Sequence, residues 1–145
     1  MQLLDEVRSA WGWVGIEPVD LIDDNDFGNL IVKDVHGQYW RICPEDLYCE
    51  VLASSREELD RVAKDQEFLS DWYMRALVDE AFQRLGALAP WQKYCLKIPG
   101  VFGGDYGGDN LGKISFDELI RASGHIAQQI ADLTDSASIK LSVND

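Results

Sequence analysis

The chain has 145 residues, 46% of them hydrophobic and 10% aromatic, which is the size and composition of one compact domain with its own core. Its 26 acidic side chains outnumber its 13 basic ones, and the resulting net charge of −13 repels phosphate backbones, so direct nucleic-acid binding is not expected. No apolar run approaches the roughly 20 residues of a membrane span, and the acidic N-terminus argues against a signal peptide. We therefore expect a cytoplasmic protein without a membrane partner.

The first third of the chain predicts a helix followed by a β-meander. Apolar residues at helical spacing predict a short amphipathic helix over residues 2–12 whose apolar face covers a sheet. Alternating apolar residues separated by turn-forming Asp, Asn and Gly predict strands at 18–23, 28–35, 38–43 and 47–53. We expect this sheet to bury one face and to have some aromatic cover on the other.

The rest of the chain is predicted to be mainly helical. Ser55 and Glu58 form a capping box that begins a helix ending near Lys64. Apolar residues at three- and four-residue steps then predict one long core helix over 67–85, ended by Gly86. The remaining predicted elements are a short strand at 94–98, a helix at 116–131 and a strand at 139–143.

This order predicts an α+β fold in which an antiparallel meander sheet packs against several helices in a compact single unit. We expect residues 1–145 to form one domain, with two possible lobes: a strand-rich segment, 1–54, and a helix-rich segment, 55–145. Three cysteines, an odd number without paired CxxC spacing, indicate buried reduced thiols and argue against a disulfide framework or a zinc site.

The glycine-rich segment 102–118, FGGDYGGDNLGKISFDE, has some features of a calcium loop. An EF-hand register with Gly112 at position 6 puts Glu118 at position 12, but it leaves Gly107 and Leu111 where side-chain oxygens are needed. We therefore interpret the segment as a turn that leads into a helix capped by Ser115 and Glu118, with no metal bound.

Catalytic motifs are scarce in this sequence. His36 falls in a predicted hairpin turn and His125 in a predicted helix, and neither has a catalytic partner nearby in sequence. The chain also lacks a nucleophile elbow, a phosphate-binding GKS or GKT loop and an HExxH motif. We predict that the protein is not an enzyme, with no catalytic residues and no cofactor.

Two blocks of sequence resemble a known family. The first, NDFGNLIVKDVHGQYWRICPEDL at residues 25–47, resembles the FGN, G-x-x-W-R-I and P-E pattern of a GAD-like domain. The second, CLKIPGVFGGDYGGDNLGKISFDELIRASGHIAQQI at residues 95–130, is similar to the C-terminal domain that accompanies it. The residues that fit the first pattern are Phe27, Gly28, Asn29, Gly37, Trp40, Arg41, Ile42, Pro44 and Glu45. Those that fit the second are Gly103, Gly104, Asn110, Phe116 and Gly124.

Together the blocks resemble the immunity proteins that protect bacteria from their own type VI secretion effectors, including DNase toxins. The resemblance covers most of the chain, although the connecting region is shorter than in larger relatives and the acidic turn at 20–26 is peculiar to this sequence. It implies a fold and a role in neutralising a toxin, but it carries over no catalytic residue. Gly103, Gly104 and Asn110 are interpreted as structural.

The resemblance and the charge pattern lead to the same hypothesis. Residues 1–55 hold 11 acidic and only 3 basic side chains, and such a surface can steer a basic protein partner to it. We predict a cytoplasmic inhibitor that forms a 1:1 heterodimer with a cognate toxin, which acts on nucleic acid or nucleotides. The predicted toxin-binding residues are Asp23, Asp24, Asp26, Glu45, Asp46, Asp105, Tyr106 and Asp109. The alternative is an acidic adaptor or regulatory protein that binds a basic host protein.

Overall fold

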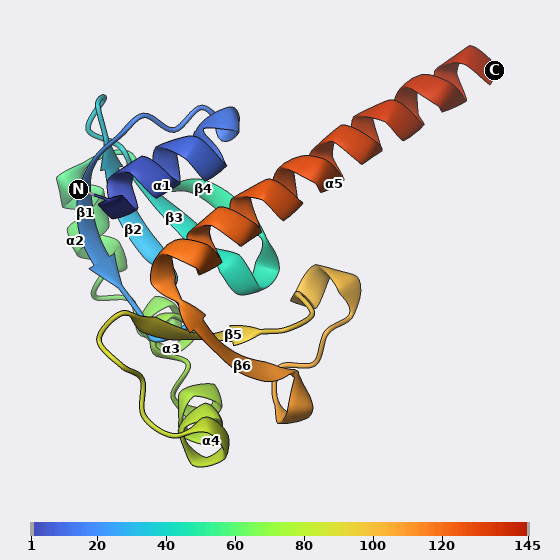
Figure 1. The fold of residues 1–145 in the computed structure, drawn as a ribbon. Helices are drawn as coiled ribbons and strands as arrows, with labels where there is room; N and C mark the ends of the chain where they lie inside the picture. Colours follow the sequence, from blue (N-terminus) through green and yellow to red (C-terminus); the bar gives the residue numbers. More distant parts are fainter. Residues whose placement is uncertain (1, 145) are drawn as a thin grey trace.

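The computed structural model describes residues 2–144, with side chains over residues 3–134. Its α-helices and β-strands come in separate runs along the chain, as in an α+β fold (Figure 1). The helices are α1 (Gln2–Trp11), α2 (Arg56–Val62), α3 (Gln66–Tyr73), α4 (Arg75–Leu85) and α5 (Phe116–Asn144). The strands are β1 (Pro18–Asp24), β2 (Leu30–Asp34), β3 (Tyr39–Cys43), β4 (Tyr48–Ala53), β5 (Gln92–Leu96) and β6 (Leu111–Ser115). Short 3-10 turns are η1 (Gly12–Val14), η2 (Pro44–Asp46), η3 (Gly100–Phe102) and η4 (Gly108–Asn110).

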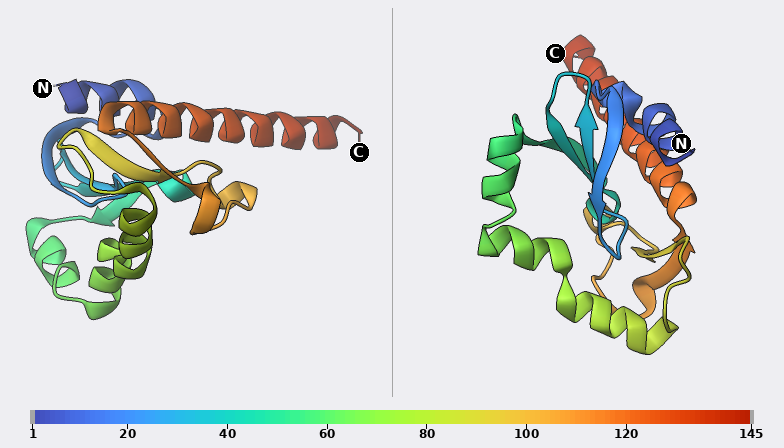
Figure 2. Two further views of the ribbon diagram at one scale, coloured as in Figure 1. Left: turned by 60° about the horizontal axis from the view of Figure 1, so that its bottom comes forward. Right: turned by 90° about the vertical axis from the view of Figure 1, so that its left-hand side faces the viewer.

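The first four strands form the predicted meander. They pair antiparallel in the order β1-β2-β3-β4, and the central β2–β3 register places Leu30 opposite Ile42 and Val32 opposite Trp40. Four of the five residues of β2 are buried, so its side chains are covered on both faces. The sheet is therefore more covered than expected, because helices lie on both of its sides (Figure 2). The expected aromatic cover of the second face is confirmed by Phe68 and Trp72 of α3.

Helices α1 and α5 pack side by side over one face of the sheet (Figures 1 and 2). Val7 and Trp11 of α1 meet Ile120 of α5, and together they cover Val32 and Ile42 of the strands. This layer confirms that the first helix covers the sheet, and it is built from apolar side chains whose burial drives the packing.

The opposite face of the sheet is covered by α2 and α3. Leu59 of α2 and Trp72 of α3 are buried against Ile31 and Tyr39 of the strands. A third cluster joins α4 to the separate β5–β6 hairpin, and Phe27, from the loop before β2, lies in it beside Tyr94. The first third of the chain is thus in contact with each later layer.

The predicted core helix over 67–85 is wrong in one respect, because it is two helices. Met74 adopts a left-handed conformation with φ of 46°, which ends α3 at Tyr73 and begins α4 at Arg75. Its backbone amide still donates to the Ser70 carbonyl, so the chain turns without losing that hydrogen bond. Apolar periodicity continues through this residue, which is why the pattern gave no signal of the break.

The C-terminal strand predicted at 139–143 is also wrong, because helix α5 continues from Phe116 to Asn144. The helix extends beyond the sheet and away from the rest of the molecule (Figure 1). Among residues 2–144, no strand lies beside this part of the chain to receive the backbone hydrogen bonds of an added strand, whereas a helix satisfies its own. The predicted end at residue 131 is therefore too early.

The two predicted capping boxes have different outcomes. Ser55 caps α2 as expected, because its hydroxyl accepts a hydrogen bond from the Glu58 amide at 3.2 Å. Ser115 directly precedes α5, but its hydroxyl is buried and has no hydrogen-bond partner in the described part of the chain, so the second box is not formed. The predicted end of the first of these helices near Lys64 agrees with the end of α2 at Val62, and Asp65 then caps α3 through the Glu67 amide.

Candidate functional site

A buried polar network lies where β2, β3 and η2 meet. The amide group of Asn29 donates to both carboxylate oxygens of Glu45, at 2.9 and 2.8 Å, and its oxygen accepts from Nε of Arg41 at 3.0 Å. All three residues are buried, with Asn29 wholly inaccessible. Such a group of buried polar side chains is tolerated because each one is hydrogen-bonded.

Arg41 connects this network to helix α3. One of its terminal nitrogens pairs with Asp71 at 2.7 Å, and the guanidinium stacks on the rings of Phe68 and Trp72. The side chain of Asp71 remains 66% exposed, whereas that of Arg41 is only 8% exposed. The pair therefore fixes a solvent-facing carboxylate in position from a buried anchor.

The turn before β2 is tied to the same helix. Asn25 donates to the Trp72 carbonyl at 2.7 Å, and its side-chain oxygen accepts from the amides of Phe27 and Asn29. Of the FGN, W-R-I and P-E residues quoted from the sequence, Asn29, Arg41 and Glu45 thus form one hydrogen-bonded unit beside α3, while Phe27 and Ile42 belong to other core clusters. Their side chains are mostly buried, so they hold the fold together at this point and leave the adjacent surface to other residues.

A groove of about 800 Å³ opens directly beside this network. It lies between η2, α3, the start of α4 and the loop after η3, and four of its lining residues are acidic while one is basic. The lining residues are Glu45, Asp46, Gln66, Leu69, Ser70, Asp71, Tyr73, Met74, Arg75, Ala76, Leu77, Glu80 and Tyr106. We call this feature the acidic groove.

The glycine-rich loop between η3 and β6 closes one side of the acidic groove. The Tyr106 hydroxyl donates to Asp46, and the Gly108 amide donates to Glu80 at 2.6 Å. Arg84 of α4 lies 3.1 Å from Glu80 and 3.6 Å from Asp109. Two of the predicted contact residues, Asp46 and Tyr106, are therefore brought together although 60 positions separate them in sequence.

The structural interpretation of Gly103, Gly104 and Asn110 is confirmed. Gly103 has a φ of +84°, a conformation that favours glycine, and a side chain at Gly104 would overlap the Ile98 carbonyl. The Asn110 side chain accepts from the Ile98 amide and donates to the carbonyls of Ile98 and Asp105. These contacts give the loop a defined shape.

Burial changes the acidity of the two η2 carboxylates. Burial raises the pKa of Glu45, and the hydrogen bonds from Asn29 offset this only in part. Burial also raises the pKa of Asp46, with the negative charge of Asp71 adding to the effect. A positive group entering the groove would therefore relieve an unfavourable accumulation of negative charge.

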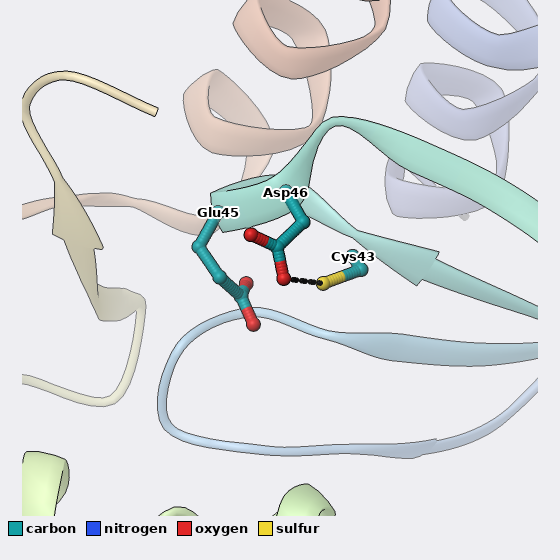
Figure 3. Close-up of side chains that lie close together, drawn as sticks. All are labelled: Cys43, Glu45 and Asp46. Atoms are coloured by element: carbon teal, nitrogen blue, oxygen red, sulfur yellow. Dashed lines mark hydrogen bonds between the residues drawn. The ribbon is translucent and has the colours of Figure 1, made fainter. Parts of the chain in front are cut away.

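Cys43, Glu45 and Asp46 lie close together, and their ligand atoms fall within 4.8 Å of one another (Figure 3). Metal binding requires a thiolate, but burial raises the pKa of the Cys43 thiol far above its usual value. The thiol instead donates to Asp46 at 3.7 Å, and the Glu45 oxygens already accept from Asn29. This corner therefore fits a hydrogen-bonded structural role better than a metal site.

The other predicted contact residues lie outside the acidic groove. Asp23 lines a smaller cavity of about 290 Å³ beside α2 and α3, and Asp24 pairs with Lys93 at 2.6 Å. Asp26 is exposed, although its carbonyl accepts from the Tyr94 amide. Asp105 is exposed on the glycine-rich loop. Of the predicted set, the structure thus brings Glu45, Asp46 and Tyr106 together at the groove and leaves the other five outside it.

Sequence reasoning missed Asp71, Glu80 and Tyr73, which complete the groove from the helices. Acids such as Asp71 and Glu80 are common on the solvated faces of helices, so no sequence pattern distinguished them. It also missed three exposed apolar residues near η3: Ile98, Val101 and Phe102, which are 54%, 59% and 56% exposed. Their signal was an apolar stretch inside a Pro- and Gly-rich loop, where polar residues are usual.

Comparisons with known proteins give a family for the chain and a solved structure with a similar fold. A family model described as "T6SS immunity protein Tdi1, C-terminal" matches residues 53–127, more than half of the chain. The fold is similar to the crystal structure of Atu4351 from Agrobacterium tumefaciens, with a TM-score of 0.57 and 15% sequence identity. The similarity covers 86% of this chain and 63% of that one, so this chain spans less than two thirds of its length. No curated protein matches the sequence.

Proposed function

Because the chain belongs to the family of the C-terminal domain of the type VI secretion immunity protein Tdi1, we propose that it binds and neutralises a cognate effector toxin. Immunity proteins of this kind typically act without catalysis, in keeping with the sequence prediction that the chain is not an enzyme. The family match is the observation that carries the proposal.

The charge of the chain supports a basic partner. The acidic groove has four carboxylates and one guanidinium in its lining, within a chain whose net charge is −13, although Arg41 and Arg84 pair with two of these carboxylates. Enzymes that act on nucleic acid or nucleotides need basic surfaces to bind phosphate, and oppositely charged surfaces accelerate protein association. We therefore propose a toxin of that class.

We propose that the contact surface includes the eight predicted residues, centred on Asp46 and Tyr106. These two combine a carboxylate with a half-exposed aromatic ring, the mixture that forms energetic centres in protein interfaces. Glu45 is buried, so its role in this surface is to hold η2 in place. We expect a 1:1 complex.

We place this complex in the cytoplasm, where the proposed target of the toxin would lie. Within residues 2–144, none of the helices has the length and apolar character needed to cross a bilayer. This proposal is tested by fractionating cells that express the chain with a C-terminal tag and assaying the soluble cytoplasmic fraction.

Co-expression tests the function directly. The toxin domain of the effector encoded next to this chain should stop growth when induced alone, and co-induction of the chain should restore it. The two proteins should also purify together as a single species in size-exclusion chromatography. Absence of both rescue and a complex would contradict the proposal, and an immunity protein for an unrelated toxin is the control for non-specific rescue.

The same experiment separates this function from the acidic adaptor alternative. An adaptor for a basic host protein would not rescue growth, and it would form complexes in cells that lack the toxin gene. Salt gives a second criterion: the association rate with the toxin should fall as ionic strength rises. A rate independent of salt would mean that the carboxylates serve solubility only.

A further inference from the structure

The loop from Ile98 to Phe102 exposes more apolar surface than a connection of this length requires. Ile98, Val101 and Phe102 are each more than half exposed, and the loop extends beyond the β5–β6 hairpin (Figure 1, yellow to orange). Connections between strands are normally polar, and clustered exposed apolar side chains mark interaction sites on soluble proteins. We call these three residues the apolar tip.

The apolar tip lies against one end of the acidic groove. Turn η3 contacts η2, and a side-chain carbon at Gly100 would lie 2.8 Å from a carboxylate oxygen of Asp46 and would overlap the Tyr106 hydroxyl. Gly100 therefore permits the close approach that places the tip beside the groove. Tyr106 lies between the two features, because it lines the groove, is 51% exposed and has its hydroxyl beside Gly100.

We propose that the apolar tip and the acidic groove form one two-part docking surface for the effector, and this inference rests on the proposed function. Val101 and Phe102 insert into an apolar pocket of the effector, while an arginine or lysine beside that pocket enters the groove. In the groove its positive charge meets Asp71 and Asp46, and its aliphatic stem lies on the rings of Tyr73 and Tyr106.

Charge complementarity selects a basic protein over the other possible occupants. A second copy of this chain would bring the same carboxylates to the groove, and the like charges would repel. An anionic lipid surface would be repelled for the same reason. A basic protein partner can contact both parts of the surface at once, because its apolar contacts supply affinity and its contacts with the carboxylates fix its orientation.

The arrangement of the acids also suits a partner cation. Asp71 is fixed by Arg41 yet remains 66% exposed, so its outward-facing side can receive a second positive group. Burial and the proximity of Asp71 raise the pKa of Asp46, and an arriving cation would lower this pKa again. Binding should therefore strengthen as pH rises through the range in which Asp46 ionises.

The test measures the affinity of purified variants for the toxin domain of the neighbouring effector by isothermal titration calorimetry. We expect Phe102→Ser to weaken binding about 30-fold and Asp71→Asn about 10-fold, as for central interface residues. The matched controls are Val35→Ser, an exposed valine in the β2–β3 turn, and Glu17→Gln, an exposed acid before β1, and both should bind like the wild type. Thermal unfolding of each variant establishes that it is folded, and Val101→Ser provides a second tip variant should Phe102→Ser unfold.

The outcomes are distinguishable from failure of the proposed function. If the wild type does not bind the toxin domain, the proposed function fails. If the wild type binds but the folded tip and groove variants bind equally well, the docking surface is wrong while the function stands. Sedimentation that shows a dimer lost in Phe102→Ser, or Phe102-dependent binding to phosphatidylglycerol vesicles, would also overturn the assignment to a basic protein partner.

Discussion

The two faces of the four-stranded sheet are both buried, but they bury different chemistry. The face under α1 and α5 is lined by apolar side chains such as Trp11, Val32 and Ile120. The face under α2 and α3 adds the charged pair Arg41–Asp71 and the Asn29–Glu45 contact, and the acidic groove opens beside it. Apolar burial stabilises without directional requirements, whereas buried charges must be paired to be tolerated. The comparison suggests that one face maintains the fold while the other positions charge for binding.

The largest expected effect is on the apolar face. Gly124 of α5 lies so close to α1 that a side chain there would overlap the Ala10 carbonyl. We expect Gly124→Val to separate the two helices and lower the free energy of unfolding by about 3 kcal/mol. Urea unfolding measures this loss.

Gly12→Ala is the control for the Gly124 substitution. An added carbon at Gly12 meets no atom of the described chain within 4 Å, and the residue lies in η1 near the same helix layer. Its stability should stay near that of the wild type. Equal stability of Gly124→Val and Gly12→Ala would show that the close α1–α5 contact does not fix this face.

The next largest effect is expected on the polar face. Replacing Arg41 by Met keeps most of the apolar volume but leaves the Asn29 side-chain oxygen buried without its donor. We expect a loss of about 2 kcal/mol in the free energy of unfolding, the cost of an unsatisfied buried acceptor together with lost stacking on Trp72. Asp71→Asn, which changes only the exposed partner, should cost less than about 1 kcal/mol. Similar losses in both variants would mean that the exposed ion pair, and not the buried network, stabilises this face.

The two faces were also unequally predictable from sequence. Alternation and helical spacing located β1 to β4 and α1, because apolar patterns report burial directly. These patterns do not indicate the break at Met74, because the break depends on the backbone angle of one residue. They also do not indicate that α5 continues to Asn144, because this depends on which elements lie beside that part of the chain. The division into lobes at residues 54 and 55 stays a prediction.

The candidate site was predictable only in part. Asp46 and Tyr106 were chosen as exposed polar or aromatic residues in turns, and the structure brings them into contact. The matched FGN and W-R-I residues identified a fold element, but sequence alone could not show that their side chains are buried. Asp71 and Glu80 were not identified because the meeting of α3, α4 and η2 depends on tertiary packing.

A pH titration can sharpen the comparison further. Burial raises the pKa of Glu45 in the folded state above its usual value of about 4.3. At pH values between the unfolded and folded pKa, Glu45 is therefore protonated in the native state but ionised in the unfolded state. The contribution of Glu45 to the free energy of unfolding therefore falls as pH rises through this range. In Glu45→Gln, the free energy of unfolding should fall less steeply with pH than in the wild type, as measured by urea unfolding in steps of about one pH unit between about pH 4 and 8. A slope unchanged in Glu45→Gln would exclude Glu45 as its source.

The smallest expected effect concerns the helices that cover the polar face. Helix α2 has only seven residues and a single buried one, Leu59, so its local cap contributes a large share of its stability. Ser55→Ala removes the hydrogen bond to the Glu58 amide and should cost about 1 kcal/mol in urea unfolding, whereas Ser55→Asp retains an acceptor and should restore most of it. If Ser55→Ala costs nothing, packing of Leu59 against the sheet alone holds α2 in place. The two faces would then differ in their buried polar groups but depend equally on apolar packing.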